Sequence, residues 1–270
     1  ISIEALKNHP NIVNTFVLDK QYVNLYKNLM SFEDFDMFLS FRSSLRSTFI
    51  KFFISSKFKY QFDKKAYSSG HPVQKYNNFI NNILNIDLNP NELKLDVIKI
   101  KKRSKKNKLL GINPGASYGS AKRWYPREFA EVASSLSNSY DIIIFAGPNE
   151  QDIAYDIEQY LIEKEVHNYK NLASKTSVSQ LISEISNLDL FITGDSGPMH
   201  VAAAFKIPSI AIFGPTRDNE TSQWMNEKSI VIKKNLECQP CMKRTCPLKH
   251  HNCMKEIKAL EVLSAVKRLN

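Results

Sequence analysis

Beyond residue 108, short apolar runs alternate with amphipathic segments, and this alternation constrains the fold more than any other feature of the chain. Five runs rich in Ile, Leu and Phe have the length of buried strands, at residues 109–112, 141–145, 188–193, 209–213 and 229–232. Helical periods begin after Pro126, and again after Ser177, which forms a capping-box pattern with Gln180. Such a series predicts a parallel, doubly wound α/β sheet with helices on both faces.

The earlier part of the chain has a weaker pattern. Residues 15–18 and 36–41 have the composition of strands, and residues 44–53 form a basic amphipathic segment that is typical of a helix. This combination predicts a second α/β unit whose beginning is missing.

Charge is distributed unevenly along the chain. Residues 1–108 contain 19 Lys and Arg against 9 Asp and Glu, whereas residues 109–270 contain 18 of each, so the formal charge of +10 comes entirely from the first part. Residues 99–108 hold seven basic side chains in ten positions, which is typical of a solvated linker. We therefore predict two domains, residues 1–104 and residues 105–270.

The apolar runs are too short for a membrane-spanning protein. Lys206 and Pro208 interrupt the longest of them, which falls well below the roughly 20 residues that cross a bilayer. The chain begins at Ile1 without a basic leader, so we expect a fragment or a trimmed product. The four cysteines lie together near the end of the chain, unlike a secreted disulfide scaffold, and this favours the cytoplasm.

Seven of the eight glycines lie between Gly111 and Gly214, mostly in loops at predicted strand ends, where open α/β sheets bind ligands. The first loop, residues 113–124, has small and hydroxyl residues followed by Lys122 and Arg123, a composition that suits an anion near a helix N-terminus. The alternative is a plain connection with surface cations. The length of the loop favours a functional role.

A second loop, residues 193–200, contains Asp195 and Ser196 before a helix that Gly197 and Pro198 would open. The two polar side chains have the alternative role of helix caps, but a cap does not require His200 one turn later. A third loop, residues 213–216, follows the next strand. Three polar loops at successive strand ends predict a nucleotide pocket.

Known phosphate-binding motifs are absent from the sequence. It contains neither G-x-G-x-x-G nor G-x-x-x-x-G-K-[ST], which weakens a dinucleotide site and excludes a P-loop. Its one D-x-D pair, Asp34 and Asp36, precedes an apolar strand of the other domain, so we interpret it as solvated carboxylates rather than a metal site.

Two further clusters have several interpretations. The four cysteines, with two histidines among them, could be free thiols, a labile disulfide or ligands of a structural Zn²⁺ or iron, at Cys238, Cys241, Cys246 and Cys253. Arg42 and Arg46 are four residues apart and would share a helical face that suits nucleic acid, anionic lipid or a phosphorylated sugar, or is simply solvated. A nucleic-acid-binding protein with a cysteine metal module is therefore one alternative function.

Taken together, the loops resemble the lipopolysaccharide heptosyltransferases of glycosyltransferase family 9. The resemblance rests on N-P-G-A-S through K-R-W at residues 113–124, G-D-S-G-P-M-H at 194–200, F-G-P-T at 213–216 and C-P-L-K-H-H-N-C at 246–253, and more weakly on residues 41–46 and 71–76. It implies a GT-B architecture of two facing Rossmann-like domains, the N-terminal one incomplete. It also implies metal-independent, inverting transfer of heptose from ADP-heptose to the heptose/Kdo inner core of lipopolysaccharide, at the inner-membrane surface, with no cofactor and no nucleic acid.

The resemblance assigns roles to residues of this chain. Lys122 would be catalytic by stabilising the leaving diphosphate, which Ser117 also contacts, while Glu150 would bind the ribose and Asp195 the heptose hydroxyls. The phosphate and sugar would be lined by Ser196, Gly197, Pro198 and His200, and the acidic acceptor would meet Arg42 and Arg46. The family's general base, an Asp in a Gly-Asp pair after the first strand, is expected upstream of Ile1. An inactive ADP-sugar-binding scaffold is therefore a second alternative.

Overall fold

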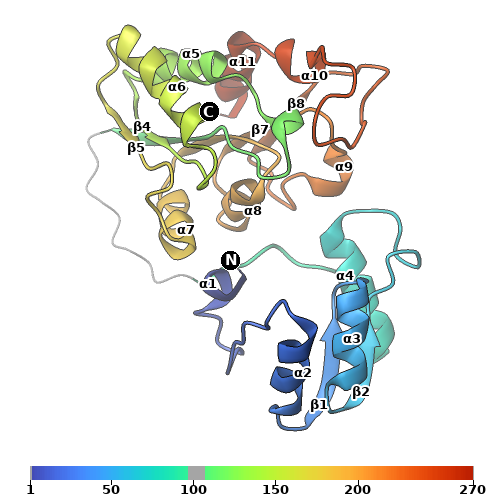
Figure 1. Cartoon of the computed structure of the whole chain (residues 1–270). Helices are drawn as coiled ribbons and strands as arrows, with labels where there is room; N and C mark the ends of the chain where they lie inside the picture. Colours follow the sequence, from blue (N-terminus) through green and yellow to red (C-terminus); the bar gives the residue numbers. More distant parts are fainter. Residues whose placement is uncertain (1, 97–106, 270) are drawn as a thin grey trace. The chain divides into compact units, whose positions relative to one another are not determined.

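The computed structural model describes residues 2–96 and 107–269, which form two compact units (Figure 1). The smaller unit is Val13–Asn91, and the larger combines Ile1–Ile12 with Glu92–Asn270. The structure thus groups the first twelve residues with the larger unit rather than with the basic part that follows them. The predicted boundary between residues 104 and 105, and most of the predicted linker, lie outside the described residues.

The larger unit is built on a six-stranded, fully parallel sheet of strand order β5-β4-β3-β6-β7-β8. All five predicted strands are present, with ends that shift by up to two residues. The sixth strand, β5, was not predicted. The strands are β3 Lys108–Asn113, β4 Tyr140–Ile144, β5 Tyr169–Asn171, β6 Leu190–Gly194, β7 Ser209–Phe213 and β8 Ser229–Lys233.

Helices cover both faces of this sheet, which confirms the doubly wound prediction (Figure 1). On one face α5 Pro126–Leu136, α6 Gln151–Glu163 and α11 Ala259–Leu269 pack on alternate strand residues such as Ile112 and Ile144. On the other, α7 Val178–Ser186 and α8 Gly197–Ala204 pack on the intervening ones, such as Phe191. The shorter elements are α1 Ser2–Leu6, the 3₁₀ turn η1 Ser120–Lys122, α9 Asp218–Thr221 and α10 Asn252–Lys255.

Local sequence signals start the helices as predicted. Pro126 occupies the first turn of α5, and Ser177 and Gln180 form a reciprocal capping box at the start of α7. The strand order reverses between β3 and β6, and open sheets bind ligands at the carboxyl ends of the strands beside such a reversal. The loops after β3 and β6 therefore lie at the preferred place for a site.

The smaller unit contains a β–α–β arrangement with two added helices. Strands β1 Phe35–Ser40 and β2 Ser56–Gln61 pair in parallel, and α3 Leu45–Phe53 connects them. Ser44 caps α3 by accepting a hydrogen bond from the Ser47 backbone amide. Helices α2 Tyr22–Met30 and α4 Pro72–Leu84 complete the unit.

The predicted strand at residues 15–18 is wrong. That segment has no regular secondary structure, and the side chain of Val17 is 84% exposed. An apolar run becomes a strand only where a neighbouring strand can satisfy its backbone groups, and among the described residues β1 pairs with β2 only. Across the described residues, none of the helices is long and apolar enough to cross a membrane.

Candidate functional site

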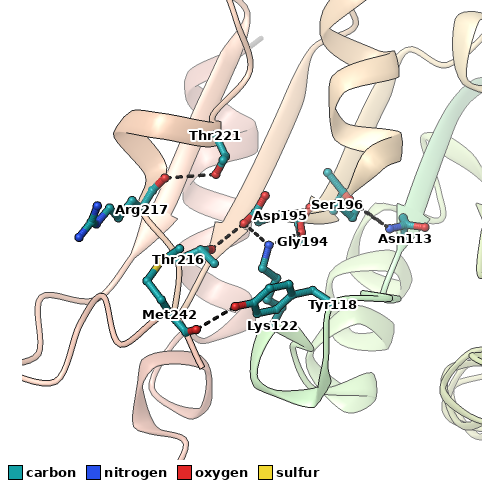
Figure 2. Close-up of polar contacts among 11 residues, drawn as sticks. Asn113, Tyr118, Lys122, Gly194, Asp195, Ser196, Thr216, Arg217, Thr221 and Met242 are labelled. Carbon is teal, nitrogen blue, oxygen red and sulfur yellow. Dashed lines mark hydrogen bonds and ion pairs between the residues drawn. The ribbon is translucent and has the colours of Figure 1, made fainter. Parts of the chain in front are cut away.

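Three loops of the larger unit meet at one buried carboxylate (Figure 2). Asp195, which follows β6, is 5% exposed, and its Oδ2 lies 2.5 Å from Nζ of Lys122 in the loop after β3. The same oxygen accepts a hydrogen bond of 2.6 Å from the Thr216 hydroxyl, in the loop after β7. The Asp195 backbone carbonyl also accepts from Lys122 Nζ, at 3.3 Å. One side chain therefore ties together the three loops that the sequence singled out.

Asn113, at the end of β3, makes a second link between these loops. Its buried side-chain amide lies 3.1 Å from the Ser196 hydroxyl and 3.3 Å from the Thr193 hydroxyl. Ser196 precedes α8, yet its hydroxyl makes no capping bond to that helix. The alternative of Ser196 as a side-chain helix cap is therefore wrong, because its hydroxyl is used to join β3 to β6.

Glu150 lies beside the first loop, with its carboxylate almost fully buried. Its Oε2 accepts a hydrogen bond of 2.8 Å from the Gly147 amide, whereas Oε1 is buried with no hydrogen-bond partner in the described part of the chain. The guanidinium of Arg123 approaches Oε1 to 4.0 Å, and Nε of Arg123 is likewise buried and unsatisfied there. Buried polar atoms normally have partners, so these two atoms are exceptions that the described residues do not satisfy.

Gly115 has a role that its place in a glycine-bearing loop does not reveal. A Cβ atom at this position would lie 1.9 Å from Oε2 of Glu150, far inside contact distance. Sequence reasoning associated this glycine with the close approach of an anion. The structure gives a different requirement, since only glycine leaves room for the Glu150 carboxylate.

The other predicted donor-site residues lie around the same loops. Ser117 is exposed in the first loop. Gly197 and Pro198 form the first turn of α8, whose N-terminus follows Asp195 directly, and His200 is half-buried one turn into the helix. Sequence reasoning gave Arg123 only a general role, as a cation beside Lys122, and gave Thr216 no role of its own, although both stand in loops that it selected.

The structure does not bring Arg42 and Arg46 onto one helical face, contrary to expectation. Helix α3 begins at Leu45, so Arg42 lies outside it. The guanidinium of Arg46 donates to the backbone carbonyls of residues 18, 19 and 20, which holds that segment in place.

Arg42 instead lines a pocket of about 660 Å³ within the smaller unit. Lys64 and Lys75 contribute two further cations to its wall. Lys64 belongs, with Arg42 and Arg46, to the basic stretch of residues 42–65, whereas no role was predicted for Lys75. Aromatic rings form much of the remaining wall, beside two serines and a proline. One of these rings, Phe62, stacks on Tyr67 at 5.3 Å between centroids. These cations are separated along the chain by more than thirty residues, which explains why spacing alone did not place them in one pocket.

The four cysteines are free thiols and line one small cavity of about 20 Å³ with His250 and His251. Burial raises the pKa of the Cys253 thiol to about 11, and the three other thiols add to the shift. Among the residues that the structure describes, no group of three or more His, Cys, Asp or Glu side chains is arranged to hold a metal ion. The alternative of a structural Zn²⁺ or iron at these cysteines is therefore not supported.

Comparison with known proteins identifies the class to which this fold and site belong. The sequence profile of glycosyltransferase family 9 (heptosyltransferase) matches residues 23–252, which is most of the chain. The chain therefore belongs to glycosyltransferase family 9 and is a glycosyltransferase. This assignment leaves the nucleic-acid-binding alternative without support.

Relatives within the family agree with this assignment. The chain is 43% identical to lipooligosaccharide heptosyltransferase 2 of Campylobacter jejuni, over 100% of this chain and 86% of that protein. It is 30% identical to lipooligosaccharide heptosyltransferase 2 of Haemophilus influenzae, over 74% of this chain and 66% of the relative.

Solved structures support the fold. ADP-heptose lps heptosyltransferase II of Escherichia coli superimposes with a TM-score of 0.80 at 21% identity, over 98% of this chain and 86% of that one. A family 9 glycosyltransferase of Veillonella parvula gives 0.79 at 18% identity, over 98% and 84%. These similarities confirm the predicted α/β, GT-B fold class.

Proposed function

We propose that this glycosyltransferase moves L-glycero-D-manno-heptose from ADP-heptose to the heptose/Kdo inner core of lipopolysaccharide, with inversion and without a metal ion. The names of its relatives support this substrate pair, since they are lipooligosaccharide and lipopolysaccharide heptosyltransferases. The observation that carries the proposal is the junction of Lys122, Asp195 and Thr216 at the carboxyl ends of β3, β6 and β7.

In this proposal the donor lies across that junction. The diphosphate meets Lys122, Ser117 and the N-terminus of α8, where the helix dipole favours negative charge. The buried, unsatisfied Oε1 of Glu150 accepts a hydrogen bond from a ribose hydroxyl. Asp195 accepts hydrogen bonds from the heptose hydroxyls, and Ser196 and His200 line the phosphate and sugar.

The chemical role of this half of the site is to stabilise the leaving group. An acceptor hydroxyl attacks C1 of the heptose and gives its proton to a general base, while the bond from C1 to the diphosphate oxygen breaks and negative charge grows on the departing ADP. In this proposal Lys122 and the N-terminus of α8 face that charge, which is the arrangement that lowers a barrier electrostatically. The ion pair with Asp195 holds Lys122 in this orientation.

In this proposal the acidic groups of the acceptor bind to the smaller unit. The pocket lined by Arg42, Lys64 and Lys75 supports the recognition of carboxylates and phosphates, and its aromatic wall supports contact with sugar rings. Arg46 contributes indirectly by holding residues 18–20. Because such an acceptor is anchored to lipid, we propose that the enzyme acts as a peripheral protein at the cytoplasmic face of the inner membrane.

The test is incubation of the protein with ADP-heptose and a heptose/Kdo–lipid A acceptor, followed by mass spectrometry of the acceptor and measurement of released ADP. A mass gain of one heptose with stoichiometric ADP is expected. Binding of ADP-heptose without transfer would instead favour the scaffold alternative. The absence of both binding and transfer would overturn the proposal.

A further inference from the structure

Two cations lie over the aromatic ring of Tyr118, in the loop after β3. The ammonium of Lys122 lies 4.7 Å from the ring centroid, and the guanidinium carbon of Arg244 lies 5.4 Å from it. The Tyr118 hydroxyl donates a hydrogen bond of 2.8 Å to the backbone carbonyl of Met242 (Figure 2). This ring therefore connects the proposed diphosphate site to a segment more than a hundred residues later in the chain.

The backbone around Arg244 is fixed against the donor loops. Its carbonyl accepts a hydrogen bond of 3.0 Å from the amide of Ala121, next to Lys122. A Cβ atom at Gly119 would lie 2.3 Å from that same carbonyl oxygen, so glycine permits the close approach. The amide of Met242 donates to the Pro215 carbonyl in the loop after β7, at 2.8 Å. Arg244 is thus held beside two of the three loops that meet at Asp195.

A bound diphosphate requires a cation beyond Lys122 and Arg123, and Arg244 can supply it. Lys122 is opposed by the Asp195 carboxylate at 2.5 Å, and Arg123 faces Glu150 at 4.0 Å, so both cations have an anion beside them. A nucleoside diphosphate adds at least two negative charges. Within the described residues, Arg244 is exposed and its guanidinium has the Tyr118 ring as a neighbour rather than a carboxylate.

We propose that Arg244 is a second diphosphate-binding residue of the donor site, oriented by the face of Tyr118. This inference rests on the proposed function, because it takes an ADP-sugar as the ligand. The planar guanidinium offers parallel N–H groups to two phosphate oxygens, which an ammonium cannot do. The exposed charge of Arg244 neutralises the diphosphate while Lys122 remains close to Asp195.

The test compares ADP with adenosine by titration calorimetry of the full chain. Arg244→Ala is expected to weaken ADP binding by about tenfold to a hundredfold, the range for a charge-assisted hydrogen bond, and to leave adenosine binding unchanged. Arg244→Lys keeps the charge without the planar guanidinium, so its affinity for ADP should lie between those of Arg244→Ala and the wild type. The matched control is Lys243→Ala, which removes a neighbouring exposed cation and should bind both ligands as the wild type does.

The outcomes separate this inference from the proposed function. If the wild-type protein fails to bind ADP, the donor assignment itself is wrong. If the wild type binds ADP and Arg244→Ala keeps the same ratio of ADP to adenosine affinity, Arg244 does not bind the diphosphate. An equal loss for both ligands would also overturn the inference, since it would mean that Arg244 only maintains the loop.

Discussion

Lys122 and Asp195, 73 residues apart in the sequence, form a 2.5 Å ion pair between the loops that follow β3 and β6. Their side chains are only 11% and 5% exposed, so neither charge is well solvated. In such a pair the loss of one partner leaves the other as an uncompensated charge. The pair therefore has two roles, in the stability of the loops and in the orientation of Lys122.

Removal of either charge is expected to destabilise the protein more than removal of both. Asp195→Ala should lower the free energy of unfolding of the larger unit by about 3–5 kcal/mol, the usual cost of an unpaired buried charge. The double variant Lys122→Ala/Asp195→Ala should recover part of this loss. Urea denaturation of the wild type, the two single variants and the double variant gives the coupling energy between the two charges. Additive effects, within about 0.5 kcal/mol, would show that the pair does not contribute to stability.

Gly115→Ala is expected to displace the Glu150 carboxylate, because its new methyl group would lie 1.9 Å from Oε2. We predict a loss of roughly 1–3 kcal/mol in stability, measured by thermal unfolding, together with weaker ADP binding. Gly197→Ala is the control for stability, since a Cβ atom there meets no heavy atom within 4 Å. The stability cost should largely disappear in a Glu150→Ala background; an undiminished cost would contradict this explanation.

The two arginines of the smaller unit should behave differently on truncation. Arg46→Ala removes the donor to the carbonyls of residues 18–20 and should cost about 1 kcal/mol of stability. Arg42→Ala should leave thermal unfolding unchanged and raise the KM for the acidic acceptor. Identical effects of the two substitutions, in unfolding and in kinetics, would contradict the separate roles.

The thiol of Cys253 should be the least reactive of the four. Its pKa is raised to about 11 by burial, so at pH 7.5 nearly all of it is protonated, and only the thiolate reacts with iodoacetamide. Its alkylation rate should continue to rise as the pH approaches 11. Peptide mapping by mass spectrometry follows each cysteine, and protein unfolded in urea is the control. Preferential alkylation of Cys253 in the folded protein would contradict the assignment.

Sequence patterns predicted the elements whose local signals agree with their environment. The runs that became β3, β4, β6, β7 and β8 are apolar because both faces of a parallel sheet are buried. Strand β5, Tyr169–Asn171, has three residues with polar character and lies at the sheet edge, so it lacks that signal. Residues 15–18 have an apolar composition but pair with no strand in the described part of the chain, and they remain irregular.

The site was predicted to the extent that its residues stand in loops at strand ends. That rule selected Lys122, Asp195 and Ser196, and the resemblance to family 9 added Glu150. It did not indicate that Gly115 is required by Glu150, or that Arg244 lies over Tyr118, because both depend on contacts between distant parts of the chain. Arg46 lies in a strongly basic part of the sequence, yet its guanidinium donates hydrogen bonds to backbone carbonyls.

The most direct test of the central claim is calorimetry of ADP binding to the wild type, to Lys122→Ala and to the surface control Lys164→Ala. Lys164 pairs with Glu131 on the surface of the larger unit, where its side chain is 37% exposed. We predict that the wild type and Lys164→Ala bind ADP equally, and that Lys122→Ala binds at least about tenfold more weakly. Equal ADP binding by all three proteins, or none by the wild type, would contradict a diphosphate site at Lys122 and Asp195.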